Sequence, residues 1–165
     1  MTAPASIDAL FIAPAAGAPM QRVRAVKAIP EQGLEGDRYA MGAGYYSGRY
    51  DCQVTLIEGE VVDAISAAGG IHIQNEEHRR NIVTRGLALR QMVQCRLKIG
   101  DVLLEFDRPR PPCDYLQRLT QPGMTRALGR GGGIGMRVLA SGWLCEGAEI
   151  EVLPIPDAKP PPRLP

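Results

Sequence analysis

The clearest folding signal in this 165-residue sequence is a run of alternating apolar and polar residues that turns back on itself. Every second residue is apolar over residues 93–99, which is the period of a strand with one face buried. Gly100-Asp101 then supplies a tight turn into another apolar run, residues 102–106. This pattern predicts a β-hairpin, places Cys95 on its buried face, and leads without a break into a proline-rich segment.

Further short strands are predicted along most of the chain. The β-rich or alternating runs are residues 7–12, 23–29, 52–57, 81–84, 136–140 and 148–153. Cys52 shares a face with Val54 and Leu56, so we expect it in the core. Helical spacing of apolar residues occurs at residues 58–68 and again just after Cys113. About seven short strands with two or three short helices predict a mainly β fold, a closed or nearly closed β-barrel.

Length and composition fit one domain. We expect a single barrel domain over residues 1–153, followed by a proline-rich disordered tail over residues 154–165. The net charge of +1 gives no reason to expect a nucleic-acid partner, and no apolar run approaches the roughly 18 residues of a membrane span. Residues 1–14 lack the basic start and continuous apolar centre of a signal peptide. A cytoplasmic location is therefore expected, with the cysteines reduced.

The proline-rich segment presents a single thiol. In Arg108-Pro109-Arg110-Pro111-Pro112-Cys113-Asp114-Tyr115-Leu116, the prolines hold the backbone extended, because each fixes its own φ and restricts the residue before it. A helix is predicted to start at or just after Cys113. The positive potential of a helix N-terminus and of nearby arginines favours the thiolate, whereas Asp114 opposes it. We therefore predict an activated cysteine; the alternative is an inert core cysteine, which the charged surroundings disfavour.

The cysteines and histidines do not predict a metal site. The four cysteines form no C-x-x-C pair, which argues against a zinc ribbon or a thioredoxin-type motif. His72 and His78 are the two histidines of the chain, and both are expected in a solvated loop because the surrounding stretch is polar. A hydrolase that pairs a nucleophile with a histidine would have to use one of these two.

A glycine-rich segment covers residues 129–135, with five glycines among seven residues. These glycines free the backbone amides to converge, with Arg130, into an anion-binding nest; a flexible turn is the alternative. A phosphate-binding P-loop is excluded because no Gly-Lys-Ser/Thr follows. A dinucleotide fingerprint also fails, because these glycines lead into a predicted strand rather than a helix.

Two other segments are rich in side chains suited to ligands. Four of the five tyrosines fall within residues 39–50, where they either cover one end of the barrel or form walls for a flat heterocycle. Arg79 and Arg80 precede the predicted strand 81–84, where they either lie in a solvated turn or face an anion.

Several of these motifs occur in the order found in MOSC domains, which take their name from the C-terminal domain of molybdenum cofactor sulfurase. The matching segments are Gly33-Leu34-Glu35-Gly36-Asp37-Arg38, Arg80-Asn81-Ile82, Leu97-Lys98-Ile99-Gly100-Asp101, Pro112-Cys113 and the closing glycine-rich hairpin. The resemblance runs over residues 7–153, so the chain resembles a small stand-alone MOSC protein.

The resemblance implies a β-barrel that binds molybdenum cofactor (molybdopterin) or a related sulfur-bearing ligand. The family cysteine matches Cys113, which would act as a sulfur carrier or sulfurtransferase by accepting sulfur as a persulfide from a pyridoxal-phosphate-dependent cysteine desulfurase. No desulfurase domain fits in 165 residues, so the desulfurase would be a separate partner and this chain would hold no pyridoxal phosphate site. Other relatives are molybdenum-dependent reductases of N-hydroxylated compounds. In that alternative Cys113 is a metal ligand of a reductase component.

The residues themselves suit the same chemistry. A pterin phosphate needs charged and amide donors, and a soft thiolate suits either persulfide chemistry or molybdenum. The predicted cofactor-binding residues are Arg38, Arg80, Asn81, Arg110, Arg130, Gly131, Gly132 and Gly133. A further alternative is a non-catalytic β-barrel that binds a small anion.

Overall fold

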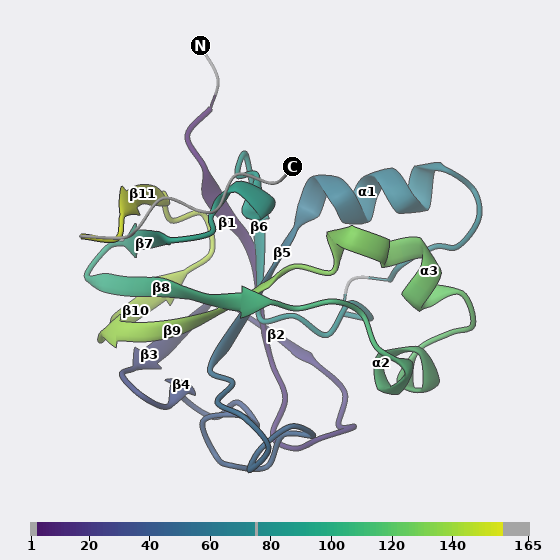
Figure 1. Ribbon diagram of the computed structural model, residues 1–165, viewed down its shortest axis with the longest axis horizontal. Helices are drawn as coiled ribbons and strands as arrows, with labels where there is room; N and C mark the ends of the chain where they lie inside the picture. The colour runs from purple at the N-terminus through teal and green to yellow at the C-terminus, as the bar shows by residue number, and fades with distance from the viewer. Residues whose placement is uncertain (1–2, 75, 157–165) are drawn as a thin grey trace, which may run out of the picture.

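The computed structural model describes residues 3–74 and 76–156. Figure 1 shows a group of strands with the three α-helices gathered on one side of them. The larger sheet has the order β11-β7-β8-β9-β5-β6-β1-β2 and the smaller sheet the order β10-β3-β4. The strands are β1 (Ser6–Ile12), β2 (Gln21–Val23), β3 (Ala25–Ile29), β4 (Gly33–Leu34), β5 (Val54–Glu58), β6 (Ile82–Arg85), β7 (Cys95–Ile99), β8 (Val102–Pro109), β9 (Ile134–Ala140), β10 (Gly142–Cys145) and β11 (Glu151–Pro154). The helices are α1 (Gly59–Ala67), α2 (Asp114–Leu119) and α3 (Met124–Leu128), and short 3₁₀ helices lie at Leu89–Gln91 and Gly129–Gly131.

The two sheets enclose one hydrophobic core. Leu10 and Leu56 of the larger sheet meet Val26 and Leu144 of the smaller sheet in it. Backbone hydrogen bonds join β1 to the segment between β10 and β11, so two distant strands of the curled sheet are brought together. The fold is therefore mainly β, a nearly closed barrel with three short helices, which confirms the prediction.

The outer side of the larger sheet carries a second apolar cluster, which holds the helices. In β1, Leu10 faces the barrel core, whereas Phe11 faces the second cluster. Leu116 of α2 and Met124 of α3 are buried in that cluster, and Cys113 packs against it. The helix that follows Cys113 is thus fixed by apolar packing on the outside of the barrel.

Several predicted elements differ in extent from the observed ones. The strand predicted over residues 23–29 is interrupted at Arg24, because β2 pairs with β1 in the larger sheet and β3 joins the smaller one. The strand predicted from residue 93 begins at Cys95, because Gln94 has a left-handed φ of 61°, and Val93 is 46% exposed. Cys95 packs against the core as predicted, although only partly buried. The helix predicted over residues 58–68 is α1.

The last strand of the described residues is β11. Pro154 pairs with Cys95, and the backbone N–H of Ile155 donates to the carbonyl of Gln94 (3.2 Å). Backbone pairing therefore continues past residue 153, where the tail was predicted to begin; residues 157–165 lie outside the described residues. None of the described helices is both long and apolar enough to cross a membrane.

Candidate functional site

The proline-rich segment continues β8 and carries Cys113 to the start of α2. The register of β8 with β7 ends at Glu105, whereas its pairing with β9 continues to Pro109. The missing N–H of Pro109 therefore breaks no bond to β7. Arg110 next donates its backbone N–H to the carbonyl of Gly133 (2.9 Å). Cys113 follows as the N-cap of α2, with extended backbone (φ −131°, ψ 167°), so the predicted helix start is confirmed.

Cys113 is half-buried, and its surroundings favour the thiolate. Burial is the largest influence and raises the pKa of the thiol. Hydrogen bonds from the Tyr46 hydroxyl and from the backbone amides of Leu116 and Tyr115, together with the charge of Arg80, act in the opposite direction. Their sum lowers the pKa of Cys113 below its ordinary value, as an activated thiol requires.

The tyrosine-rich loop supplies the hydroxyl at Cys113. Tyr45 stacks on Tyr115 of α2, with ring centroids 3.8 Å apart and an interplanar angle of 11°. Tyr46 stacks on Tyr50 (5.0 Å, 24°), and the Arg110 guanidinium lies 5.3 Å from the centroid of the Tyr46 ring. These contacts lay the loop against α2 and fix the Tyr46 ring beside the thiol. The rings of Tyr45 and Tyr46 pack on other tyrosines and on arginine, so these two side chains cover the site, whereas Tyr39 and Tyr50 line a cavity of about 390 Å³.

Arg80 joins the proline-rich segment to the glycine-rich segment. Its Nε donates to the carbonyl of Gly132 (2.7 Å) and its Nη2 to the carbonyl of Arg110 (3.0 Å). The side chain is buried, and burial, followed by the charge of Arg110, lowers the pKa of Arg80 to about 10. Arg80 therefore stays charged at neutral pH. Its hydrogen bonds join the glycine-rich segment to the proline-rich segment, and its positive charge favours the thiolate of Cys113.

Asn81 and Arg38, two further predicted donors, direct their polar groups into the protein. The Asn81 side-chain oxygen accepts from the N–H and hydroxyl of Thr55 (3.0 and 3.1 Å), and its amide donates to the carbonyl of Phe11 (3.1 Å). Arg38 pairs with the Asp37 carboxylate (3.0 Å) and donates to the carbonyl of Arg79 (3.2 Å). Both side chains are buried and tie strands and loops together around the site.

The glycine-rich segment leads into β9, as predicted. Three of its glycines, Gly131, Gly132 and Gly133, are required by close packing. A Cβ on Gly131 would lie 2.6 Å from the Val61 side chain, and one on Gly133, which has a φ of 97°, would meet the carbonyl of Leu56. The hydrogen bonds that Arg80 and Arg110 make to this segment reach its carbonyl oxygens rather than its amides.

Cys52 was predicted in the core, and this prediction is wrong. Cys52 precedes β5, is half-buried, and borders a cavity of about 390 Å³ together with Tyr39 and Tyr50. Burial raises the pKa of the Cys52 thiol, and the charges of Arg110 and Arg38 only partly offset this effect. The chain thus holds a second thiol near the arginines, with the opposite shift in pKa from Cys113.

Several of the residues predicted from the sequence lie together in the structure around Arg80. Arg80 hydrogen-bonds to the backbone of Arg110 and Gly132, and its charge acts on Cys113. Arg130 is exposed and borders a cavity of about 350 Å³ that Arg110 also lines. Among the described residues, no group of three or more His, Cys, Asp or Glu side chains is placed to hold a metal ion.

Two contributors were not predicted, Tyr46 as the partner of Cys113 and Arg90 as a cavity-lining residue. The tyrosine-rich composition of residues 39–50 was the available signal for Tyr46, but no local pattern connects that loop to residue 113. Arg90 lies on the 3₁₀ helix Leu89–Gln91, and its position depends on tertiary packing.

His78 is not in a solvated loop, contrary to the prediction, whereas His72 is exposed as expected. The His78 ring is buried edge-on against Phe11, with centroids 5.4 Å apart, and its Nδ1 accepts the backbone N–H of Arg80 (2.9 Å). His78 therefore supports the backbone at Arg80 behind the site.

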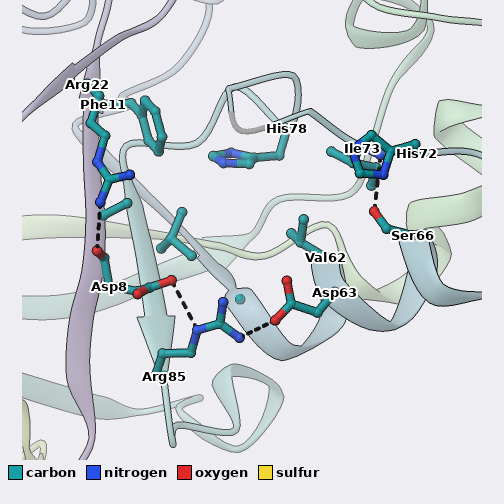
Figure 2. A pocket seen from close by; sticks show the side chains of 13 residues that line it. Asp8, Phe11, Arg22, Val62, Asp63, Ser66, His72, Ile73, His78 and Arg85 are labelled. Carbon is teal, nitrogen blue, oxygen red and sulfur yellow. Dashed lines mark hydrogen bonds and ion pairs between the residues drawn. The ribbon is translucent and has the colours of Figure 1, made fainter.

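A separate cavity of about 270 Å³ lies beside His78, between β1, α1 and the segment that precedes β6 (Figure 2). Arg85 pairs there with Asp8 (3.0 Å) and Asp63 (2.6 Å), as the dashed lines show. Arg22 pairs with Glu146 (2.7 Å). Because its arginines are already neutralised by carboxylates, this cavity is a weaker candidate for an anion site than the one beside Arg130.

Comparisons with known proteins agree with this architecture. The MOSC domain model matches residues 37–151. The YuaD protein from Bacillus subtilis has a TM-score of 0.76 at 18% sequence identity, covering 92% of this chain and 97% of that one. YiiM from Geobacillus stearothermophilus has a TM-score of 0.69 at 18% identity (92% and 80% covered), and YiiM from Escherichia coli 0.64 at 18% (93% and 74% covered). No curated protein sequence gives a significant match. At this identity the solved structures show a shared fold, and the match to the family model over most of the sequence shows that the chain belongs to the MOSC domain family.

Proposed function

We propose that this MOSC protein handles molybdenum cofactor and that Cys113 accepts sulfur as a persulfide from a separate pyridoxal-phosphate-dependent cysteine desulfurase. The observation that carries the proposal is the environment of the Cys113 sulfur. The sulfur lies at the start of α2, at the end of a proline-stiffened segment, and the nearby Tyr46 hydroxyl, the first backbone amides of α2 and the charge of Arg80 lower the pKa of its thiol. These are the surroundings of a nucleophilic thiol rather than an inert one.

The transfer step needs no added oxidant. The Cys113 thiolate attacks the outer, sulfane sulfur of the desulfurase persulfide. A bond forms between Cys113 Sγ and that sulfur, the sulfur–sulfur bond of the donor breaks, and the donor cysteine leaves as a thiolate. The proton on the outer sulfur moves with it, so the product at Cys113 is a protonated persulfide. The donors that stabilise the Cys113 thiolate raise the fraction of this nucleophile that is present at neutral pH.

The cofactor part of the proposal depends on cationic donors beside a cavity. Arg110 and Arg130 line a cavity of about 350 Å³, which lies within the size range of small-molecule sites. Arg80 supports the wall of this cavity, because it donates to the carbonyls of the lining residues Arg110 and Gly132, whereas Arg38 and Asn81 bind partners elsewhere in the protein. The cofactor, when bound, supplies the molybdenum centre that receives sulfur in the sulfurase chemistry from which the family takes its name.

Sulfur loading tests this proposal. Purified protein is incubated with a cysteine desulfurase and L-cysteine, and the cysteine peptides are analysed by mass spectrometry. We expect a gain of about 32 Da on the Cys113 peptide in the wild type and in the control variant Cys95→Ser, with no loading of Cys113→Ser. Equal loading of all four thiols, or none, would contradict a sulfur-carrier role. Stoichiometric molybdenum that is lost in Cys113→Ser, without persulfide in the wild type, would instead identify the cysteine as a metal ligand.

A further inference from the structure

Two adjoining cavities form a groove next to the proline-rich segment. Their volumes are about 350 Å³ and 390 Å³, each large enough for part of a small organic ligand. The residues that line both are Leu89, Arg90, Arg130, Gly133 and Ile134. We call the combined depression the arginine groove. Arg110 and Pro111 line its first part, so it runs along the segment that ends at Cys113.

The walls of the arginine groove are largely apolar. Phe106, Pro109 and Val93 line the first part, and Val61 and Ile65 of α1 line the second. Val93 is 46% exposed, which is unusual for a valine beside other apolar side chains. Apolar walls of this kind accept the faces of a flat or apolar molecule.

The two arginines are held by different short helices. Arg90 belongs to the 3₁₀ helix Leu89–Gln91, whose first amide donates to the Glu58 carboxylate (2.7 Å). Arg130 belongs to the 3₁₀ helix Gly129–Gly131, which is packed on Val61 so closely that Gly131 has no space for a Cβ. Both backbones are thus fixed, while both side chains are exposed.

The arginine groove carries an excess of positive charge. Within residues 3–74 and 76–156, neither Arg90 nor Arg130 forms an ion pair. The lining holds one carboxylate, Glu58, which accepts the amide of Leu89, so the arginines of the groove outnumber its acidic residues. Apolar walls together with two exposed, unpaired arginine side chains complement a molecule with a flat apolar body and an anionic end.

We propose that the arginine groove binds a flat aromatic or heterocyclic anion, with Arg90 and Arg130 holding its phosphate, sulfonate or carboxylate group. This inference rests on the proposed function in one respect, because a pterin phosphate belongs to this class of ligand. It adds Arg90 as a binding residue and names the features that the ligand must have.

Two fluorescent probes of matched shape test the groove. 1-Anilinonaphthalene-8-sulfonate carries the anion, and N-phenyl-1-naphthylamine has the same rings without it. Each is titrated into wild type, Arg90→Gln, Arg130→Gln and the control Arg126→Gln, an exposed arginine of α3 that does not line the groove. Thermal unfolding of each variant checks that it is folded.

We expect the dissociation constant for the sulfonate to rise roughly tenfold in Arg90→Gln and in Arg130→Gln, and to stay unchanged in Arg126→Gln. Affinity for the uncharged probe should not change in these variants, whereas Val93→Ser should weaken both probes. Equal wild-type affinity for the two probes, or the same loss in Arg126→Gln, would overturn the proposal.

The two proposals fail separately. Absence of sulfonate binding with normal persulfide loading of Cys113 overturns the groove proposal alone. Normal sulfonate binding with no loading overturns the sulfur-carrier role and leaves the groove as an anion site.

Discussion

Arg80 donates its Nε to the carbonyl of Gly132 at 2.7 Å and its Nη2 to the carbonyl of Arg110 at 3.0 Å. A single buried guanidinium therefore ties the glycine-rich segment to the segment that carries Cys113. Arg80 was predicted as a direct cofactor donor. In the structure its hydrogen bonds serve the protein, and its charge remains close enough to influence the thiol.

Replacing Arg80 should therefore destabilise the fold as well as the site. Arg80→Gln leaves the two carbonyls without their charged donor in a buried position, and we expect the free energy of unfolding to fall by about 2–4 kcal/mol. Urea denaturation measures this loss. The exposed Arg126→Gln is the matched control and should change stability by less than about 0.5 kcal/mol. A near-wild-type Arg80→Gln would mean that the two loops are held together by other contacts.

The glycine-rich segment offers a test of its packing. In Gly133→Ala the new Cβ would meet the carbonyl of Leu56, at a residue whose φ is 97°. We expect a loss of roughly 3–5 kcal/mol in the free energy of unfolding, from strain and overpacking together. Gly129 has a φ of 49° and a ψ of −121° but open space around the Cβ, so Gly129→Ala should cost only the backbone strain, about 1–3 kcal/mol. Equal losses in the two variants would show that Gly133 is not closely packed.

Tyr46 offers a test of how the thiol is activated. Tyr46→Phe keeps the ring contacts with Tyr50 and Arg110 but removes the hydroxyl that donates to Cys113. Losing a donor to the charged form raises the pKa of the thiol, so the pH–rate profile for alkylation of Cys113 should move up by about one pH unit. Tyr45→Phe is the control, because its ring stacking on Tyr115 is retained. Coincident profiles for Tyr46→Phe and wild type would remove the hydroxyl from the description of the site.

Periodicity predicted most of the fold, because alternation and turn residues are local signals. The hairpin of β7 and β8, helix α1 and the start of α2 at Cys113 follow from residues that are adjacent in sequence. Errors arose where a local break intervenes. Gln94 takes a left-handed conformation and exposes Val93, and Cys52 lies ahead of β5 instead of inside it.

The candidate site was harder to predict because it is assembled over long distances in the chain. Cys113 could be identified from its charged, proline-rich surroundings. Tyr46 lies in the tyrosine-rich loop and Cys113 at the start of α2. No local pattern in either segment predicts that the two come together in the fold. The burial of His78 behind Arg80 was hidden for the same reason, since its polar neighbours in sequence are not its neighbours in the fold.

Competitive alkylation within one sample decides whether the fold activates one thiol above the others. Wild-type protein is pulsed with iodoacetamide from about pH 6 to about pH 9, and the cysteine peptides are quantified, with the exposed Cys145 as an internal reference. The pKa of Cys113 is lowered and that of Cys52 is raised, so more of Cys113 is thiolate at neutral pH, and its rate should decline only as the pH falls through the lowered value. We expect Cys113 to react faster than Cys52 at neutral pH and its profile to have the lower midpoint. Equal rates for the two thiols, or a higher midpoint for Cys113, would contradict an activated sulfur at the end of the proline-rich segment.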